Sequence, residues 1–145
     1  MRPYSHILVP VDLGDQSKRV LHEAKTIADR FGSRVDLLYC FPNPQFPDTT
    51  GLLNPFSSEV IEEARKDAEL QLQAMLTSEE RELYQAKVTV AVADPLTAIV
   101  DYAKREGVDL IVMGTHGRTG LTHMFLGSVA ERVVRTAPCP VLTVH

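Results

Sequence analysis

The chain has 145 residues, of which 44% are hydrophobic and 23% charged, and this fits one globular domain rather than a disordered chain. A net charge of −4 argues against nucleic-acid binding, which requires a basic surface. The two cysteines, Cys40 and Cys139, are far apart in sequence, so neither a disulfide scaffold nor a zinc cluster is expected. The start lacks the pattern of a secretory signal, and no apolar run reaches about 18 residues. We therefore expect a cytoplasmic protein without membrane insertion.

The first predicted strand is the apolar run at residues 6–11, which has the β-branched content of a strand buried on both faces. A helix with one apolar face follows, and Gly32 is its natural stop. The residues of that face are Val20, Ala24, Ile27, Ala28 and Phe31. Residues 35–41 are the second predicted strand. Residues 42–56 contain four prolines, so this segment is either a disordered loop or a functional flap beside the ligand.

A second helix is predicted after this segment, beginning near Ser57 or Ser58. Its apolar face comprises Ile61, Ala64, Ala68, Leu72 and Met75. The third strand, at residues 87–93, alternates between apolar and polar positions, which favours an edge of the sheet. Asp94 and Pro95 then form a strong helix start, and Gly107 ends that helix. Its apolar face comprises Leu96, Ile99, Val100 and Ala103.

The last part of the chain supplies a buried strand at residues 110–113, a fourth helix and a final strand at 141–144. The apolar face of this helix comprises Ala130, Val133, Val134 and Ala137. Strands and helices thus alternate, which predicts an α/β fold over residues 1–145: an open, doubly wound, five-stranded parallel sheet with helices on both faces. Two strand orders are common for such a chain, 3-2-1-4-5 and 2-1-3-4-5.

Ligands of such sheets bind at the carboxyl ends of the strands, where the strand order reverses. In the order 3-2-1-4-5 this point lies between the first and the fourth strand. Asp12 directly follows the first strand. Its carboxylate would accept hydrogen bonds from a ribose or help to hold a metal ion. The alternative is that Asp12 caps the next helix.

The segment after the fourth strand carries the strongest functional signal. Between Gly114 and Ser128 it contains four glycines, which allow backbone N–H groups to approach an anion closely. The fourth helix begins at Gly127–Ser128, where free N–H groups would bind phosphate, and Arg118 would neutralise its charge. The alternative is a glycine-rich turn before a capped helix. No Walker motif is present, which excludes a Walker-type NTPase, and no G-x-G-x-x-G follows the first strand, which disfavours a dinucleotide fold of the usual kind. No G-x-S-x-G elbow is present either, so a fast hydrolase is not indicated.

The spacing of three of these glycines matches the motif of a known protein family. Gly114, Gly117 and the pair Gly127–Ser128 fit G-x2-G-x9-G-[ST], by which the sequence resembles the universal stress protein family and its ATP-binding motif. Further matches are the runs at 7–12, 103–114 and 138–144, so the resemblance covers essentially the whole chain.

The resemblance implies the order 3-2-1-4-5, a homodimer paired through the strand at 141–144, and ATP, with Mg²⁺, bound without Walker motifs. The residues implied at the nucleotide are Pro10, Val11, Asp12, Cys40, Met113, Gly114, Gly117, Gly127, Ser128 and Val129, with Arg118 added from its place in the loop. The sequence departs from the family at Gly14, where a serine is common, and at Ala93, where a glycine is common.

The function predicted is that of an ATP-binding regulator whose nucleotide occupancy is read by a protein partner. One alternative is a slow ATPase or autophosphorylating protein with Ser128 or a nearby threonine as acceptor. Another is a dimeric interaction module without nucleotide. If ATP is bound, a bulky residue at Gly114 or Gly127 is expected to abolish binding without unfolding the domain.

Overall fold

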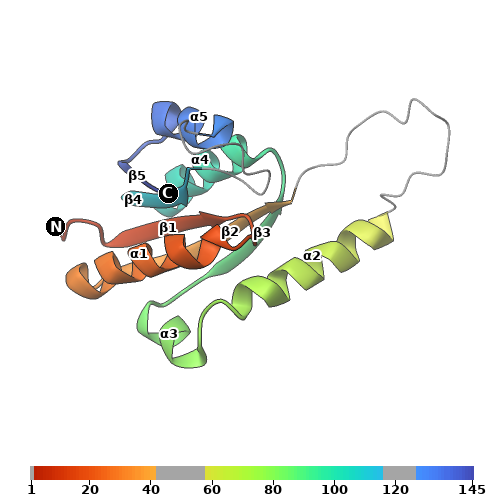
Figure 1. Cartoon of the computed structure of the whole chain (residues 1–145), viewed down its shortest axis with the longest axis horizontal. Coiled ribbons are helices and arrows are strands. Elements are labelled where there is room, and N and C mark those ends of the chain that lie inside the picture. The colour runs from red at the N-terminus through yellow and green to blue at the C-terminus, as the bar shows by residue number, and fades with distance from the viewer. Residues whose placement is uncertain (1, 42–57, 116–126) are drawn as a thin grey trace.

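The computed structural model describes residues 2–41, 58–115 and 127–145. Five parallel strands form one sheet in the order β3-β2-β1-β4-β5 (Figure 1), which confirms one of the two predicted orders. In chain order the elements are β1 (His6–Val11), α1 (Gln16–Phe31), β2 (Arg34–Phe41), α2 (Ser58–Gln73), α3 (Ser78–Leu83), β3 (Val88–Val92), α4 (Pro95–Glu106), β4 (Leu110–Gly114), α5 (Ser128–Thr136) and β5 (Val141–Val144).

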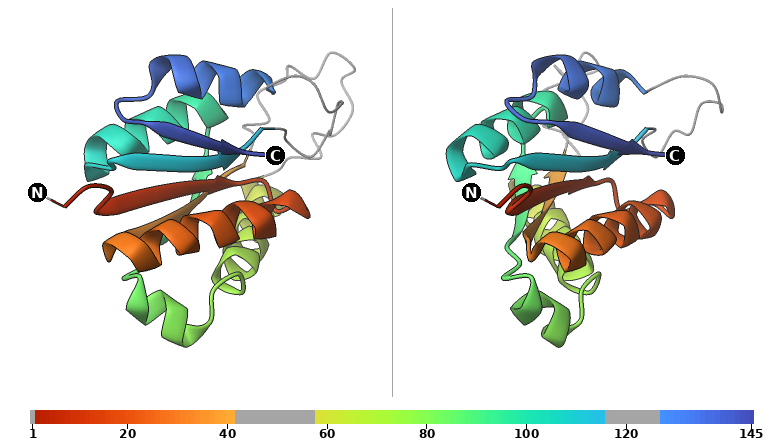
Figure 2. Two further views of the ribbon diagram at one scale, coloured as in Figure 1. Left: turned by 60° about the vertical axis from the view of Figure 1, so that its left-hand side comes forward. Right: turned by 90° about the vertical axis from the view of Figure 1, so that its left-hand side faces the viewer.

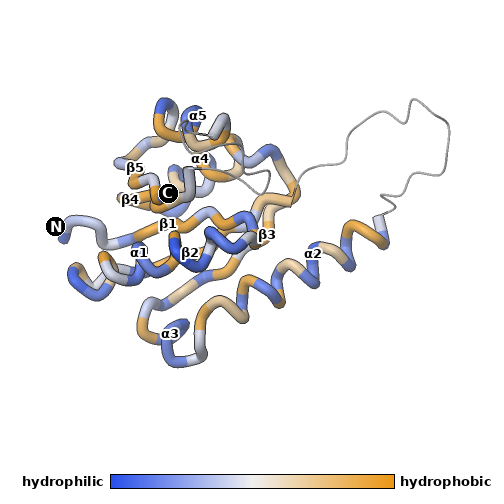
Figure 3. The backbone as a smooth tube through the Cα atoms, viewed as in Figure 1, coloured by the Kyte–Doolittle hydropathy of each residue, from blue (hydrophilic) through white to orange (hydrophobic). Residues whose placement is uncertain are grey.

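Helices cover both faces of the sheet, as predicted for a doubly wound fold. α1, α2 and α3 lie on one side and α4 and α5 on the other (Figure 2). Consecutive residues of β1 pack into the hydrophobic cores on the two sides of the sheet in turn, because the side chains of a strand point to alternate faces. Ile7 and Val9 belong to the core under α1, whereas Leu8 belongs to the core under α4 and α5. Hydrophobic residues accordingly concentrate in the strands (Figure 3).

The predicted helix signals at Gly32, Asp94 and Gly107 are confirmed. Gly32 and Gly107 follow α1 and α4 in the left-handed conformation, each with φ 68°. A residue with a Cβ is disfavoured at such a backbone angle. The Asp94 side chain accepts a hydrogen bond from the Thr97 N–H at 3.1 Å, as an N-cap residue does.

The region between β2 and β3 differs most from the prediction. α3 is an additional helix, and its signal was present in the sequence as a capping box between Thr77 and Glu80. α2 buries Ala68 and Leu72, whereas the predicted face residues Ile61 and Ala64 are half-buried. The reason is visible in Figure 1, where the amino-terminal half of α2 extends past the sheet.

Two other predicted core positions lie at the surface. Phe31 is 39% exposed and Val134 is 48% exposed. Phe31, the last residue of α1, packs edge-on against the Tyr4 ring, with the centroids 5.4 Å apart. Helical spacing places a residue on a face, but the partner element determines how far along the helix that face is covered.

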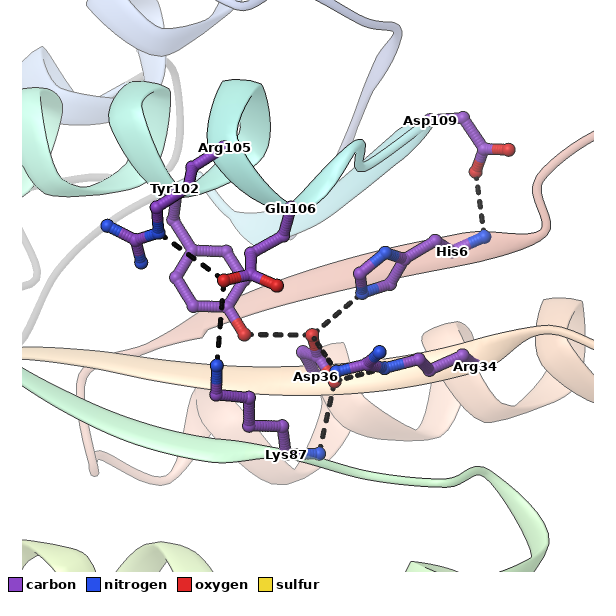
Figure 4. Close-up of polar contacts among 8 residues, drawn as sticks. All are labelled: His6, Arg34, Asp36, Lys87, Tyr102, Arg105, Glu106 and Asp109. Carbon is purple, nitrogen blue, oxygen red and sulfur yellow. Dashed lines mark hydrogen bonds and ion pairs between the residues drawn. The ribbon is translucent and has the colours of Figure 1, made fainter.

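Asp36 is a fully buried carboxylate near the amino end of β2, and it joins four parts of the structure (Figure 4). Its Oδ2 lies 2.7 Å from His6 Nε2 on β1 and accepts the hydroxyl of Tyr102 on α4 at 2.8 Å. Its Oδ1 accepts the Lys87 backbone N–H before β3 at 3.0 Å and Arg34 Nε at 3.0 Å. The network therefore links β1, β2 and the start of β3 to α4.

Charged side chains surround this network at the surface. The Tyr102 ring lies 5.4 Å from the Arg105 guanidinium carbon and 5.9 Å from Lys87 Nζ (Figure 4). Glu106 contacts both cations, at 3.3 and 3.5 Å. Burial by itself raises the pKa of the Asp36 carboxyl, but hydrogen bonds from His6, Tyr102, Arg34 and Lys87 outweigh it and leave the pKa below its ordinary value.

We expect Asp36→Asn to lower the free energy of unfolding by about 3 kcal/mol, because a neutral amide leaves buried donors without their acceptor. Urea denaturation measures this. Asp67→Asn is the matched control, since Asp67 accepts one hydrogen bond, from Gln71, on the exposed surface of α2. A loss in Asp36→Asn no larger than in this control would show that the network contributes little.

The lowered pKa of Asp36 also predicts an acid dependence. A carboxyl whose pKa is lower in the folded state contributes stability that is complete above its unfolded pKa of about 3.9 and is lost as the pH falls through the folded value. The stability difference between the wild type and Asp36→Asn should therefore shrink as the pH is lowered from about 5 to about 3. Urea midpoints across this range test it, and a constant difference would contradict it.

Candidate functional site

The carboxyl ends of β1 and β4 meet at the centre of the sheet, where the strand order reverses. β1 is in register with β2 along all six of its residues, but with β4 only at Ile7–Leu110 and Leu8–Ile111. The ladder between β1 and β4 thus covers their first residues and ends before Pro10. This explains how a central strand accommodates Pro10, which has no N–H to donate. The rim beyond this point is the candidate site.

At this rim the chain leaves β1 in a tight turn. The Asp12 Oδ1 accepts hydrogen bonds from the Gly14 N–H and from the Ser17 hydroxyl, both at 2.8 Å. The N-cap position of α1 is Asp15, so the alternative interpretation of Asp12 as the helix cap is wrong. Leu13, between Asp12 and Gly14, has φ 63°, a left-handed conformation that costs a non-glycine residue about 1 kcal/mol or more.

On the other side of the rim, β4 ends at Met113–Gly114, and the chain then passes through Thr115. The Thr115 carbonyl accepts the Gly127 N–H at 2.6 Å, and the Thr115 N–H donates to the Val144 carbonyl at 3.0 Å. The first bond holds the start of α5 beside the end of β4, and the second joins the end of β4 to β5. The rim therefore joins two segments that are far apart in the sequence.

Gly114 faces α1. A Cβ at this position would lie 3.1 Å from Gln16 Oε1 and 3.5 Å from Val20 Cγ2. The absence of a side chain at Gly114 thus allows α1 to pack closely against β4. The expectation that a bulky residue here leaves the fold intact needs correction, because that residue would press against α1.

The amino end of α5 offers backbone donors at the same rim. Gly127 is the N-cap residue, with φ −59° and ψ 154°, and no described side chain caps this helix. Ser128 is exposed, and Val129 is half-buried against the core under α4 and α5. A helix start leaves its first N–H groups without intrahelical acceptors, and these groups favour an anion.

Cys40 lies one strand further out, on β2, in register with Ala91 of β3. Burial, with a smaller contribution from the Asp94 carboxylate, raises the pKa of the Cys40 thiol to about 12. The thiol is therefore neutral near pH 7, which suits a pocket wall better than a nucleophile. Ala93, one of the two departures from the family pattern, follows β3 and donates its N–H to the Phe41 carbonyl at 3.1 Å.

Of the residues predicted at the site, one group lies at the joined ends of β1, β4 and α5. These are Pro10, Val11, Asp12, Met113, Gly114, Gly127, Ser128 and Val129. Cys40 lies near the end of the adjacent strand, and Gly117 and Arg118 are outside the described residues. Within the described ranges no three His, Cys, Asp or Glu side chains group as metal ligands, and no helix is long and apolar enough to cross a membrane.

Three contributors to the rim escaped the sequence analysis: Leu13, Gln16 and Ser17. Ser17 is 4% exposed and bonds Asp12 across the first turn of α1. Gln16 approaches Gly114 and, through Nε2, donates to the Val144 carbonyl at 3.4 Å. No sequence motif signals these contacts, because they depend on where α1 begins relative to β1.

The doubly wound parallel sheet in this order, with the turn at Asp12 and the start of α5 at its carboxyl ends, places the protein in the α/β class. The chain belongs to the universal stress protein family, whose model matches residues 3–145. A universal stress protein of Methanocaldococcus jannaschii is 37% identical over 97% of this chain and 82% of its own length.

Solved structures agree with this assignment. A universal stress protein from Lactobacillus plantarum is 29% identical, covers 100% of both chains and has a TM-score of 0.78. Another, from Archaeoglobus fulgidus, was solved in complex with dAMP; it is 25% identical, covers 98% of each chain and has a TM-score of 0.65.

We expect Gly114→Val to lower the free energy of unfolding by about 1–3 kcal/mol, because its methyl groups would displace α1. Gly114→Ala should stay close to the wild type, since the flexible end of Gln16 can move away from a single Cβ. Thermal and urea unfolding without ligand measure both. Equal stability of the two variants would contradict the close packing of α1 on Gly114.

Proposed function

We propose that this protein binds ATP at the rim between β1, β4 and α5 and acts as a regulator whose occupancy is read by a partner. The observation that carries the proposal is the α5 start, which has no side-chain cap among the described residues. It is held beside β4 by the hydrogen bond between Gly127 and Thr115. The family pattern of glycines from Gly114 to Ser128 supports the same conclusion.

Phosphate would dock on the first turn of α5. The N–H groups after Gly127 point out of the helix start, and the helix dipole adds positive potential there. The Ser128 hydroxyl is exposed and would donate one further hydrogen bond. Gly117 and Arg118 complete the proposed phosphate site by their places in the glycine pattern. Backbone donors of this kind make phosphate binding compatible with a net charge of −4.

The nucleoside would lie over the ends of β1 and β2. Asp12 would accept a hydrogen bond from the ribose, with Pro10, Val11 and Met113 beside it. The neutral, half-buried Cys40 would form part of the adenine pocket. The dAMP complex of the Archaeoglobus fulgidus relative supports an adenine nucleotide as the ligand.

Mg²⁺ would be held mainly by the phosphates themselves. Within the described part of the chain, no group of three His, Cys, Asp or Glu side chains could hold the ion by itself. Mg²⁺ bound to nucleotides commonly takes one or two carboxylates, with phosphate oxygens and water as its other ligands. One carboxylate at the rim is consistent with this mode of binding.

The same proposal includes a homodimer through β5 in the cytoplasm. β5 is an edge strand, so its outer backbone groups are available to another strand. Leu142 on β5 is 39% exposed and Val134 on α5 is 48% exposed, and a second copy would cover both. Pairing of two β5 strands would place two nucleotide rims in one assembly.

The experiment is titration calorimetry with ATP, with native mass spectrometry to report bound nucleotide and subunit count. We expect Gly127→Val to weaken ATP binding by about tenfold or more, because a β-branched side chain would obstruct the approach of phosphate to the N–H groups. The backbone angles of Gly127, φ −59° and ψ 154°, are open to any residue, so the fold should be retained.

Unchanged affinity in a folded Gly127→Val protein would contradict the phosphate site. A wild-type protein that binds no ATP in the presence of Mg²⁺ would contradict the proposed function as a whole. A purely monomeric mass would remove the dimer and leave the nucleotide proposal standing.

A further inference from the structure

The Asp12 carboxylate is held from one side only. Its Oδ1 accepts two hydrogen bonds, from the Gly14 N–H and the Ser17 hydroxyl, both at 2.8 Å. No described residue donates a hydrogen bond to its Oδ2. Asp12 is half-buried, so the carboxylate keeps one oxygen for a ligand at the rim.

Ser17 bonds Asp12 twice. The Ser17 hydroxyl donates to Asp12 Oδ1, and Ser17 Oγ accepts a hydrogen bond from the Asp12 backbone N–H at 3.3 Å. A hydroxyl that bonds both the backbone and the side chain of one residue restricts the rotation of that side chain. Ser17 is 4% exposed, so water does not readily replace it. The serine therefore fixes which carboxylate oxygen is engaged.

Gly14 supplies the space for this arrangement. A Cβ at Gly14 would lie 3.1 Å from Asp12 Oδ1 and 3.6 Å from Oδ2. The contact with Oδ2 is an ordinary one, but the contact with Oδ1 is tight, so the carboxylate would have to shift by a few tenths of an ångström. The glycine at this place, where the family often has serine, thus belongs to the same arrangement.

We propose that Ser17 is a positioning residue that directs Asp12 Oδ2 to one hydroxyl of the sugar, so that the site binds a nucleotide with that hydroxyl more tightly than the analogue that lacks it. This inference rests on the proposed ATP site. Without the Ser17 hydroxyl, only the Gly14 N–H holds Oδ1, so the terminal torsion of Asp12 is less restricted, because such sp³–sp² torsions are broad. The hydrogen bond to the sugar then weakens, whereas the phosphate contacts at α5 do not change.

The test compares ATP, 2′-deoxy-ATP and 3′-deoxy-ATP by calorimetry, with Mg²⁺, on the wild type and Ser17→Ala. We expect the wild type to bind at least one deoxy analogue about tenfold more weakly than ATP, the ratio that corresponds to one hydrogen bond to a charged group. In Ser17→Ala, ATP affinity should fall by about this factor, and the ratio between ATP and that analogue should approach one.

Ser33→Ala is the matched control. Ser33 is also 4% exposed, and its hydroxyl donates to the Tyr4 carbonyl at the amino ends of β1 and β2, away from the candidate site. It should lose comparable stability but keep the wild-type affinities and ratio. Gly14→Ala is a second variant that keeps the Ser17 hydroxyl and displaces the carboxylate, and it should also lower the ratio.

Several outcomes would overturn the inference. One is a wild type that binds ATP and both deoxy analogues equally, and another is a Ser17→Ala protein that keeps the wild-type ratio, whatever its affinity for ATP. If Ser17→Ala does not fold, an unchanged ratio in Gly14→Ala overturns it. A wild type that binds none of the three nucleotides contradicts the ATP site itself, and the first titration distinguishes this failure.

Discussion

The burial of β1 between two helical layers is the constraint on which the rest of the structure depends. Ile7, Leu8 and Val9 are fully buried, and they belong alternately to the two cores. A strand of this kind needs a neighbouring strand on each side and helices on each face, because exposure of its apolar side chains to water would be unfavourable. Where the chain leaves β1, these requirements end, and a polar turn at Asp12 becomes possible.

The amino ends and the carboxyl ends of the strands then have different roles. At the amino ends, Asp36 is surrounded by donors from four parts of the chain, and its carboxylate is fully engaged. At the carboxyl ends, Asp12 uses one oxygen internally and α5 begins without a described side-chain cap. The first arrangement stabilises the fold. The second has hydrogen-bonding capacity left for a ligand, which is what separates a binding rim from a structural network.

Much of this was accessible from the residues alone. The strand runs, the stops at Gly32 and Gly107 and the Asp94–Pro95 start depend on local chemistry, so the sequence predicted them within one or two residues. The glycine spacing after β4 indicated the family. α3 was missed although its Thr77–Glu80 capping box was readable, and the exposure of Phe31 and Val134 was not foreseen. Local periodicity cannot report how far a partner element extends.

The sequence by itself determined the alternation of strands and helices, the helix ends and the residue types available at the rim, because each follows from neighbours in the chain. The tertiary structure decided which side chains and backbone groups surround Asp36, that Gly114 faces α1 and that Ser17 bonds Asp12. The contacts of Asp36 and Gly114 join residues brought together by the packing of α4 on β2 and of α1 on β4, and the bond between Ser17 and Asp12 depends on where α1 begins after β1. Their geometry exists only after the two cores have formed.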